Sequence, residues 1–386
     1  MNTNTVEVFL TSRYDFKFNE ISNKLEFKRR TDTDYQELTE YFMHSLIRQL
    51  HQAGIKIQKK DLGEMLYSDF TVRYNPFLEY FNGLPVYYEE DNDYIQDLAN
   101  TVVVSPEERE HWNIWFRKWM VGVVACAIDE RHVNQTVLVF VGSQGIGKTA
   151  WFNRLPPSSL SSYCYSGSIN PGNKDSEIQL SENLLINLDE LENLGRRNLQ
   201  SLKETITKQY IKIRRPYATH VEQMPRRASF MGSVNDIEFL KDETGNRRFL
   251  CFEALNIDYM HNVNMDMVYA QALYLFRNGV RFWFREEEIV EINLHNERYR
   301  SVSLEQEVIE SLFEPCPPNI EPELRLQTSE LLIYIFNHSS IGHRLSVRGL
   351  GIALKRMNWS KRKINGTRYW LLNTKRVELR GALTVA

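Results

Sequence analysis

The chain has 386 residues, 42% of them hydrophobic and 25% charged, and its formal net charge is −3. This length predicts two or three domains with hydrophobic cores, and the small net charge excludes recruitment to nucleic acid or membrane by bulk electrostatics alone. Any site for a polyanion must therefore come from local clustering of basic residues.

The cysteines stand singly along the chain, which disfavours both a zinc site and a disulfide framework. No segment has the pattern of a secretory signal, and the longest apolar run, Trp119 to Ile128, is about half as long as a membrane span. The sequence thus predicts a soluble, cytoplasmic protein without a membrane partner.

Residues 1–130 predict a mixed or helical N-terminal module, a candidate oligomerisation collar. Residues 6–30 alternate around "NEISNK" as a two-stranded hairpin does, and residues 35–62 have helical spacing with Gly54 as a stop. A further helix is signalled from Ser105, and its aromatic residues at three- and four-residue spacing indicate a core face.

Residues 131–300 carry short apolar runs without alternation. Such runs are typical of strands buried on both faces of an α/β sheet that helices cover. Beyond Phe252 the spacing becomes helical and predicts a small helical lid.

The stretch "GSQGIGKT" fits the pattern G-x-x-x-x-G-K-[ST] and follows a strand-like run. Gly142, Gly145 and Gly147 would let backbone N–H groups converge on phosphate oxygens, Lys148 would reach the β and γ phosphates, and Thr149 would bind Mg²⁺. The alternative is an ordinary glycine-rich turn. The pattern favours a phosphate cradle, with ATP and Mg²⁺ as cofactors.

A second apolar run, "NLLINLDELENL", ends in two carboxylates. Asp189 is predicted to bind Mg²⁺ and Glu190 to polarise the attacking water as general base. Such a strand end is a weak signal alone and becomes specific when it follows a phosphate-binding loop.

Two later turns carry polar residues whose roles stay open. Asn235 ends the run "ASFMGSVN" and could sense the γ-phosphate or simply form a turn. Arg247 and Arg248, in "DETGNRRF", could reach a neighbour's γ-phosphate or could be solvated.

Residues 196–227 hold nine Lys and Arg against two Glu, a net charge of +7. The alternation of aromatic and basic residues there predicts a hairpin that binds a nucleic-acid backbone by charge and stacking. A solvated edge strand is the alternative. The candidate DNA-binding residues are Lys212, Arg214, Arg215 and Tyr217.

The charge changes sign near residue 325, from −6 over residues 301–340 to +10 over residues 341–386. This change predicts an acidic, proline-containing linker over residues 301–327. It also predicts a winged-helix-like domain over residues 328–386, which ends in a hairpin. The alternative is a solvated basic tail. The predicted DNA contacts are Lys361, Arg362, Lys363 and Arg368.

Four motifs in order, "GSQGIGKT", "LLINLDELENL", "LKETITKQYIKIRRPYATHVEQMPRRASFMGSVN" and "FLKDETGNRRF", resemble those of the virulence-associated protein E family, superfamily 3 helicase-like AAA+ ATPases of phages and mobile elements. The resemblance covers about Thr136 to Glu253. It implies a P-loop AAA+ core that forms a ring, usually a hexamer, with ATP at subunit interfaces.

The resemblance also implies roles for the ambiguous residues. Asn235 would be a sensor, Arg247 or Arg248 the finger supplied to the neighbouring site, and Lys212 to Tyr217 the pore hairpin on single-stranded DNA. Such cores usually accompany a primase domain, for which this sequence shows no acidic triad, so a separate primase is the expected partner.

These observations predict an ATP-hydrolysing, ring-forming DNA helicase or translocase that acts in the replication of a phage or mobile element. The alternative is a nucleotide-switched DNA-binding or interaction protein, in regulation or defence, that does not unwind DNA. Both functions need the same motifs.

Overall fold

A computed structural model describes residues 3–170, 173–188, 191, 196–214, 220–240, 246–339 and 342–375. The chain divides into two compact units, Met1–Tyr299 and Arg300–Ala386. Within the described ranges, no helix combines the length and apolar character needed to cross a membrane.

The first unit begins with a small sheet in the order β3-β2-β1-β4 and three helices. The predicted hairpin is present as β1 and β2, which pair antiparallel. The expectation that the hairpin begins at residue 6 is wrong, because Val6, Phe9 and Leu10, spaced by three and four, form the buried side of a helix and the first strand begins at Tyr14. The elements are α1 (Thr3–Thr11), β1 (Tyr14–Asn19), β2 (Lys24–Arg29), β3 (Gln36–Glu37), α2 (Glu40–Gln52), α3 (Lys59–Leu66) and β4 (Val72–Tyr74).

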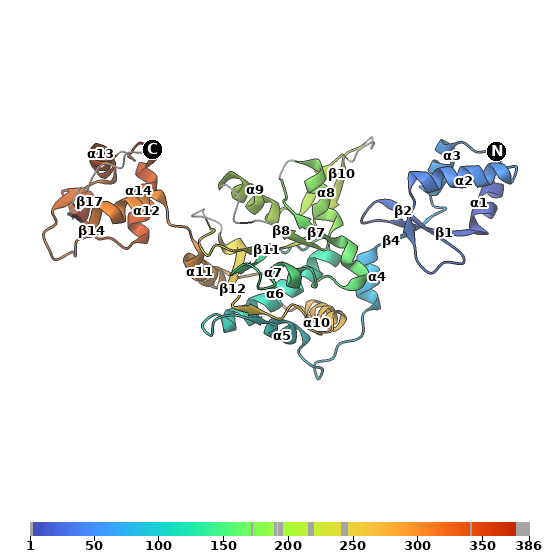
Figure 1. Cartoon of the computed structure of the whole chain (residues 1–386), viewed down its shortest axis with the longest axis horizontal. Helices are drawn as coiled ribbons and strands as arrows, with labels where there is room; N and C mark the ends of the chain where they lie inside the picture. Colours follow the sequence, from blue (N-terminus) through green and yellow to red (C-terminus); the bar gives the residue numbers. More distant parts are fainter. Residues whose placement is uncertain are drawn as a thin grey trace. The chain divides into compact units, whose positions relative to one another are not determined.

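The centre of this unit is a parallel five-stranded sheet in the order β12-β6-β11-β8-β7 (Figure 1). This arrangement confirms the predicted mixed α/β fold with helices on a parallel sheet. The strands are β6 (Val137–Val141), β7 (Cys164–Gly167), β8 (Leu185–Leu188), β11 (Ser229–Val234) and β12 (Phe249–Glu253).

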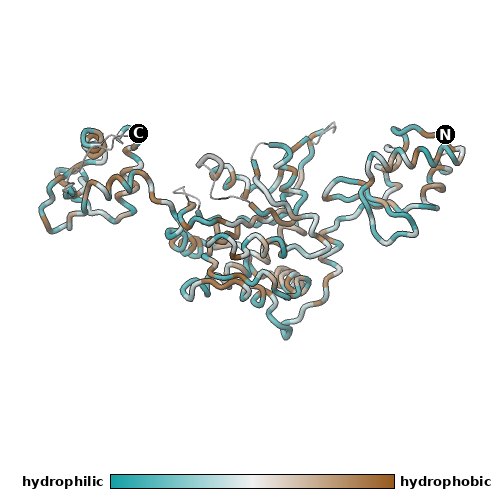
Figure 2. Tube along the Cα trace, viewed as in Figure 1, coloured by the Kyte–Doolittle hydropathy of each residue, from teal (hydrophilic) through white to brown (hydrophobic). Residues whose placement is uncertain are grey.

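Both faces of the sheet are buried, as the uninterrupted apolar runs predict. Leu138 and Phe140 of β6 pack with α6 (Arg109–Ile128) and α10 (Met265–Arg277). Val139 instead packs in the cluster that includes buried residues of α8 (Lys174–Glu182) and α9 (Arg196–Thr207). Figure 1 shows α6 and α10 on one face and α8 and α9 on the other. In Figure 2 the hydrophobic segments run through these strands and the helices against them.

The remaining elements of the first unit connect or cover this sheet. They are α4 (Pro76–Gly83), α5 (Tyr94–Asn100), β5 (Val102–Val103), α7 (Lys148–Phe152), η1 (Ser158–Tyr163), α8 (Lys174–Glu182), α9 (Arg196–Thr207), β9 (Tyr210–Ile213), β10 (Glu222–Pro225), η3 (Asn246–Arg248), β13 (Asn256–Ile257), α11 (Glu286–His295) and η4 (Asn296–Tyr299). The helix expected from Ser105 begins at Arg109, because residues 106–108 form a turn.

The second unit packs three helices against a small antiparallel sheet in which β17 is central. Residues 301–327 do not form a separate linker, because Val308, Ile309 and Phe313 are buried in the core of this unit. Its elements are α12 (Leu304–Leu312), β14 (Phe313–Pro315), β15 (Leu324–Leu326), α13 (Thr328–His338), η5 (Gly342–Arg344), α14 (Val347–Arg356), β16 (Lys361–Ile364) and β17 (Thr367–Thr374).

Candidate functional site

The glycine-rich loop (residues 142–149) leaves the central strand β6 at the carboxyl edge of the sheet. The N–H of Gly142 donates to the carbonyl of Val234, 3.2 Å away, so the loop begins beside the end of β11. Open α/β sheets bind ligands at this edge. The topology therefore places the loop where a ligand site is expected.

The three glycines of the loop have φ angles of 153°, 88° and 96° at Gly142, Gly145 and Gly147, a region that favours glycine. A Cβ atom at Gly142 would lie 2.7 Å from the carbonyl oxygen of Ala254, and one at Gly147 would overlap the ring of Tyr259. At Gly145 the added atom would meet open space. The loop thus has the backbone that a phosphate cradle needs, and residues with side chains would distort it.

Lys148 is 7% exposed, and its ammonium group lies within the loop. Its Nζ atom donates to the carbonyl oxygens of Gly142 (2.5 Å) and Ser143 (2.9 Å) and to Oδ1 of Asn235 (3.1 Å). The structure therefore brings together Lys148 and Asn235, two predicted site residues that follow different strands, β6 and β11. A buried cation beside convergent N–H groups can stabilise a phosphate.

The predicted metal site is only partly described. Thr149 is exposed in the first turn of α7, and Leu188 ends β8 opposite Gly232 of β11. Asp189 and Glu190 follow in sequence and lie outside the described residues. Their roles at the carboxyl edge stay predictions.

Arg247 and Arg248 lie at the opposite edge of the sheet. They precede β12, whose first residue, Phe249, pairs with Val137 at the start of β6. The length of β6, about 13 Å at 3.3 Å per residue, therefore separates them from the glycine-rich loop of the same chain. Neither arginine can contact a phosphate held by that loop.

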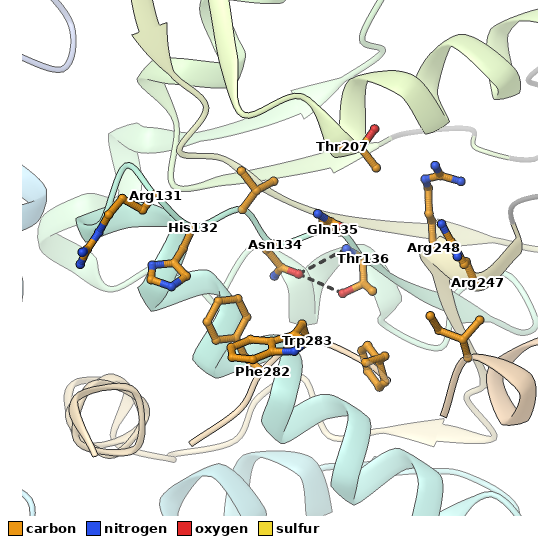
Figure 3. A pocket seen from close by; sticks show the side chains of 13 residues that line it. Arg131, His132, Asn134, Gln135, Thr136, Thr207, Arg247, Arg248, Phe282 and Trp283 are labelled. Carbon is orange, nitrogen blue, oxygen red and sulfur yellow. Dashed lines mark hydrogen bonds between the residues drawn. The ribbon is translucent and has the colours of Figure 1, made fainter. Parts of the chain in front are cut away.

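The two arginines line a cavity of about 360 Å³, and among the described residues that line it there is no carboxylate. Figure 3 shows them on one side and His132, Phe282 and Trp283 on the other. The Nε atom of Arg248 is buried and has no hydrogen-bond partner among the described residues. Burial, and then the charge of Arg247, lower the pKa of Arg248. An anion that does not come from the described residues would stabilise the buried positive charge of Arg248 beside Arg247.

The predicted basic hairpin is present as β9 and β10, which pair antiparallel. Ile211 and Ile213 are buried in the core, whereas Tyr210, Lys212 and Arg214 are exposed on the other face. Arg215 and Tyr217 lie outside the described residues. The described part of the hairpin thus presents one aromatic and two basic side chains to the exterior.

Arg226 contributes to the positive charge of this stretch but is only 1% exposed. Its guanidinium donates to the carbonyls of Lys208, Ala228 and Asn134. These bonds hold the base of the hairpin against the starts of β6 and β11. Arg226 is therefore a structural residue, which its place in a basic sequence did not reveal.

The hairpin β16–β17 carries the four predicted C-terminal contacts. Lys361, Lys363 and Arg368 are exposed, and Lys363 lies directly opposite Arg368. The ammonium of Lys361 lies 3.7 Å from the ring centroid of Trp370. Arg362 instead donates to the carbonyl of Pro318 and pairs with the acidic segment at Glu321, so its charge is partly compensated.

Sequence reasoning missed Tyr259. Its ring lies against Gly147, yet the two residues are far apart in the sequence and no motif marks the segment that carries the tyrosine. Only the folded chain shows the contact.

The family model described as the virulence-associated protein E-like domain matches residues 86–301. The chain matches no curated protein. Among solved structures, "The apo structure of NrS-1 C terminal region (305-718)" is 12% identical, with 96% of this chain and 98% of that chain covered and a TM-score of 0.44. "The A form apo structure of NrS-1 C terminal region-CTR" is 14% identical, with the same coverage and a TM-score of 0.46.

Proposed function

The chain belongs to the virulence-associated protein E-like family, and from this premise we propose that it is an ATP-hydrolysing DNA helicase or translocase of a phage or mobile element. It would act as a ring, usually of six subunits, on single-stranded DNA during replication, beside a separate primase. The observation that carries the proposal is the bond between Lys148 and Asn235 at the glycine-rich loop, because it joins a phosphate-binding lysine to a polar strand end.

ATP and Mg²⁺ fit the residues present at the carboxyl edge. The glycine conformations leave room for phosphate oxygens, and Lys148 supplies the opposing charge. Thr149 and Asp189 would hold Mg²⁺, which neutralises charge on the phosphates, and Glu190 would accept the proton of the attacking water.

The place of the arginines supports the proposed ring. Because Arg247 and Arg248 lie at the edge opposite their own glycine-rich loop, they would serve the loop of a neighbouring subunit. Each ATP site of this P-loop AAA+ core would then be complete only at a subunit interface.

Two basic hairpins would contact DNA. Tyr210 and Lys212 on β9, and Arg214 directly after it, are proposed to follow single-stranded DNA in the ring, with Arg215 and Tyr217 beyond them. In the C-terminal unit, proposed to be winged-helix-like, Lys363 and Arg368 are opposed like charges, which destabilise a hairpin unless an anion binds both.

The test is ATP hydrolysis and strand displacement by Lys148→Ala, with Lys60→Ala on α3 as control. The proposal expects loss of both activities at Lys148 and wild-type values at Lys60, whose side chain is exposed. Unchanged hydrolysis in Lys148→Ala would contradict the site. DNA-stimulated hydrolysis without strand displacement would indicate a nucleotide-switched protein that does not unwind DNA.

A further inference from the structure

An exposed aromatic ring lies against the glycine-rich loop. Tyr259 is 41% exposed, and its ring atoms approach Gly147 so closely that no side chain could be added there. The neighbouring Leu255 and Met260 are 54% and 65% exposed. An apolar surface therefore adjoins a loop whose own groups are suited to anions.

The segment that carries this ring, residues 254–261, is held by hydrogen bonds to three other parts of the chain. The N–H groups of Ala254 and Asp258 donate to the carbonyls of Val141 and Thr101, each over 2.8 Å, and β13 pairs with β5. Arg154 donates to the carbonyl of His261 over 3.0 Å. Tyr259 is thus held in place before a ligand binds, which limits the entropy lost on binding.

The helix that follows the glycine-rich loop contributes to the same hydrogen-bond network. The indole Nε1 of Trp151 in α7 donates to Oγ1 of Thr101, 2.7 Å away, and Thr101 is the residue whose carbonyl holds Asp258. The tyrosine and the loop are therefore positioned by one connected set of bonds.

The alternative is that Tyr259 is an exposed residue without a binding role, since single exposed apolar side chains are common on protein surfaces. One observation favours a ligand: the ring occupies the space beside Gly147 of the glycine-rich loop rather than an open part of the surface. A nucleotide held by its phosphates must place its sugar and base next to that loop.

We propose that Tyr259 is the platform on which the nucleoside of the bound nucleoside triphosphate stacks. The inference rests on the proposed ATP site and adds how the site recognises more than phosphate. Stacking of a base on an aromatic side chain changes affinity by about tenfold to a hundredfold when the ring is removed. The preference should be for a triphosphate that carries a base over one that does not.

The experiment measures the affinities of the full chain for ATP and for inorganic tripolyphosphate by titration calorimetry. Tyr259→Ala should weaken ATP binding at least about tenfold and leave tripolyphosphate binding unchanged. Tyr259→Phe, which keeps the ring, should bind ATP like the wild type, as should Tyr88→Ala, which removes another exposed tyrosine. Retained tripolyphosphate binding also reports that the variant is folded.

Three results would overturn the platform alone. Two concern Tyr259→Ala: ATP binding that equals the wild type, or equal losses for ATP and tripolyphosphate, which would show that the ring only supports the loop. A wild-type chain that binds tripolyphosphate and ATP equally well would also overturn it. A wild-type chain that binds neither compound would overturn the phosphate site and the platform together.

Discussion

The Nζ atom of Lys148 lies 3.1 Å from Oδ1 of Asn235, so the glycine-rich loop and the end of β11 share a hydrogen bond. The lysine also bonds two loop carbonyls, so removal of the amide leaves its position supported. In the proposed ATP site, Asn235 would therefore act on the reacting phosphate and would not be needed to hold the lysine.

For Asn235→Ala we expect kcat for ATP hydrolysis to fall about tenfold to a hundredfold, with the Kd for ATP within about threefold of wild type. Steady-state kinetics and nucleotide titration measure the two quantities. Asn153→Ala, an exposed amide after α7, is the matched control. A variant that lost binding and turnover equally would show that Asn235 supports the loop instead of the reaction.

Glu190→Gln should bind ATP and fail to hydrolyse it, because an amide cannot accept the proton of the attacking water. Loss of a general base lowers the rate by about 10² to 10⁴. Glu90→Gln, an exposed carboxylate, is the control. Substantial turnover in Glu190→Gln would assign the general base to another residue.

Much of the fold is predictable because local spacing decides it. The buried strand β6 and the hairpin turn at Asn365 and Gly366, with φ angles of 49° and 85°, follow from residue type alone. Helix α1 was missed because Val6 and Val8 also alternate as a strand would, and only packing shows that Phe9 and Leu10 lie on its buried side.

The site was predictable in part. The motif gives Lys148 and its glycines, since a phosphate cradle requires those residue types at that spacing. The contact of Tyr259 with Gly147 and the place of Arg247 at the opposite edge depend on strand order, which no local pattern encodes. The expected linker at residues 301–327 was inferred from charge and prolines, whereas the buried Ile309 places it in a core.

The double variant Lys212→Ala/Arg214→Ala should weaken binding of single-stranded DNA and flatten its salt dependence. Each lost phosphate contact lowers the slope of log K against log salt by about 0.7, so the double variant should lose about 1.4. Fluorescence anisotropy at several salt concentrations measures the slope. Lys56→Ala/Lys60→Ala on the first unit is the control, and an unchanged slope would assign binding to β16–β17.

Low pH should destabilise the first unit through His261, which is 6% exposed and has no hydrogen bond to either ring nitrogen among the described residues. Burial, and then the charge of Arg154, hold the pKa of His261 below its ordinary value of 6.5. The unfolded chain therefore binds more protons, so stability is full above pH 6.5 and falls as the pH drops below it.

Denaturant unfolding followed by tryptophan fluorescence measures this effect, because Trp151 lies 6.5 Å from the His261 ring. The free energy of unfolding should decrease less between neutral pH and pH 5 in His261→Phe than in the wild type. His44→Gln, which replaces an exposed histidine, should show the same decrease as the wild type. Parallel pH profiles for wild type and His261→Phe would assign the decrease to other groups.

Mixing two inactive variants tests whether the arginines act between subunits. One of the variants Arg247→Ala and Arg248→Ala should lower the rate of ATP hydrolysis by about 10³ to 10⁵. That variant identifies the arginine that acts on the ATP of the neighbouring subunit. An equal mixture of this arginine variant with Lys148→Ala should regain about one quarter of wild-type activity. Half of the subunits then carry an intact loop, and half of the neighbours of those subunits supply an intact arginine. A mixture of Lys148→Ala with Glu190→Gln, which damages the same side of the site in every subunit, should regain none. No recovery in the first mixture would contradict action between subunits.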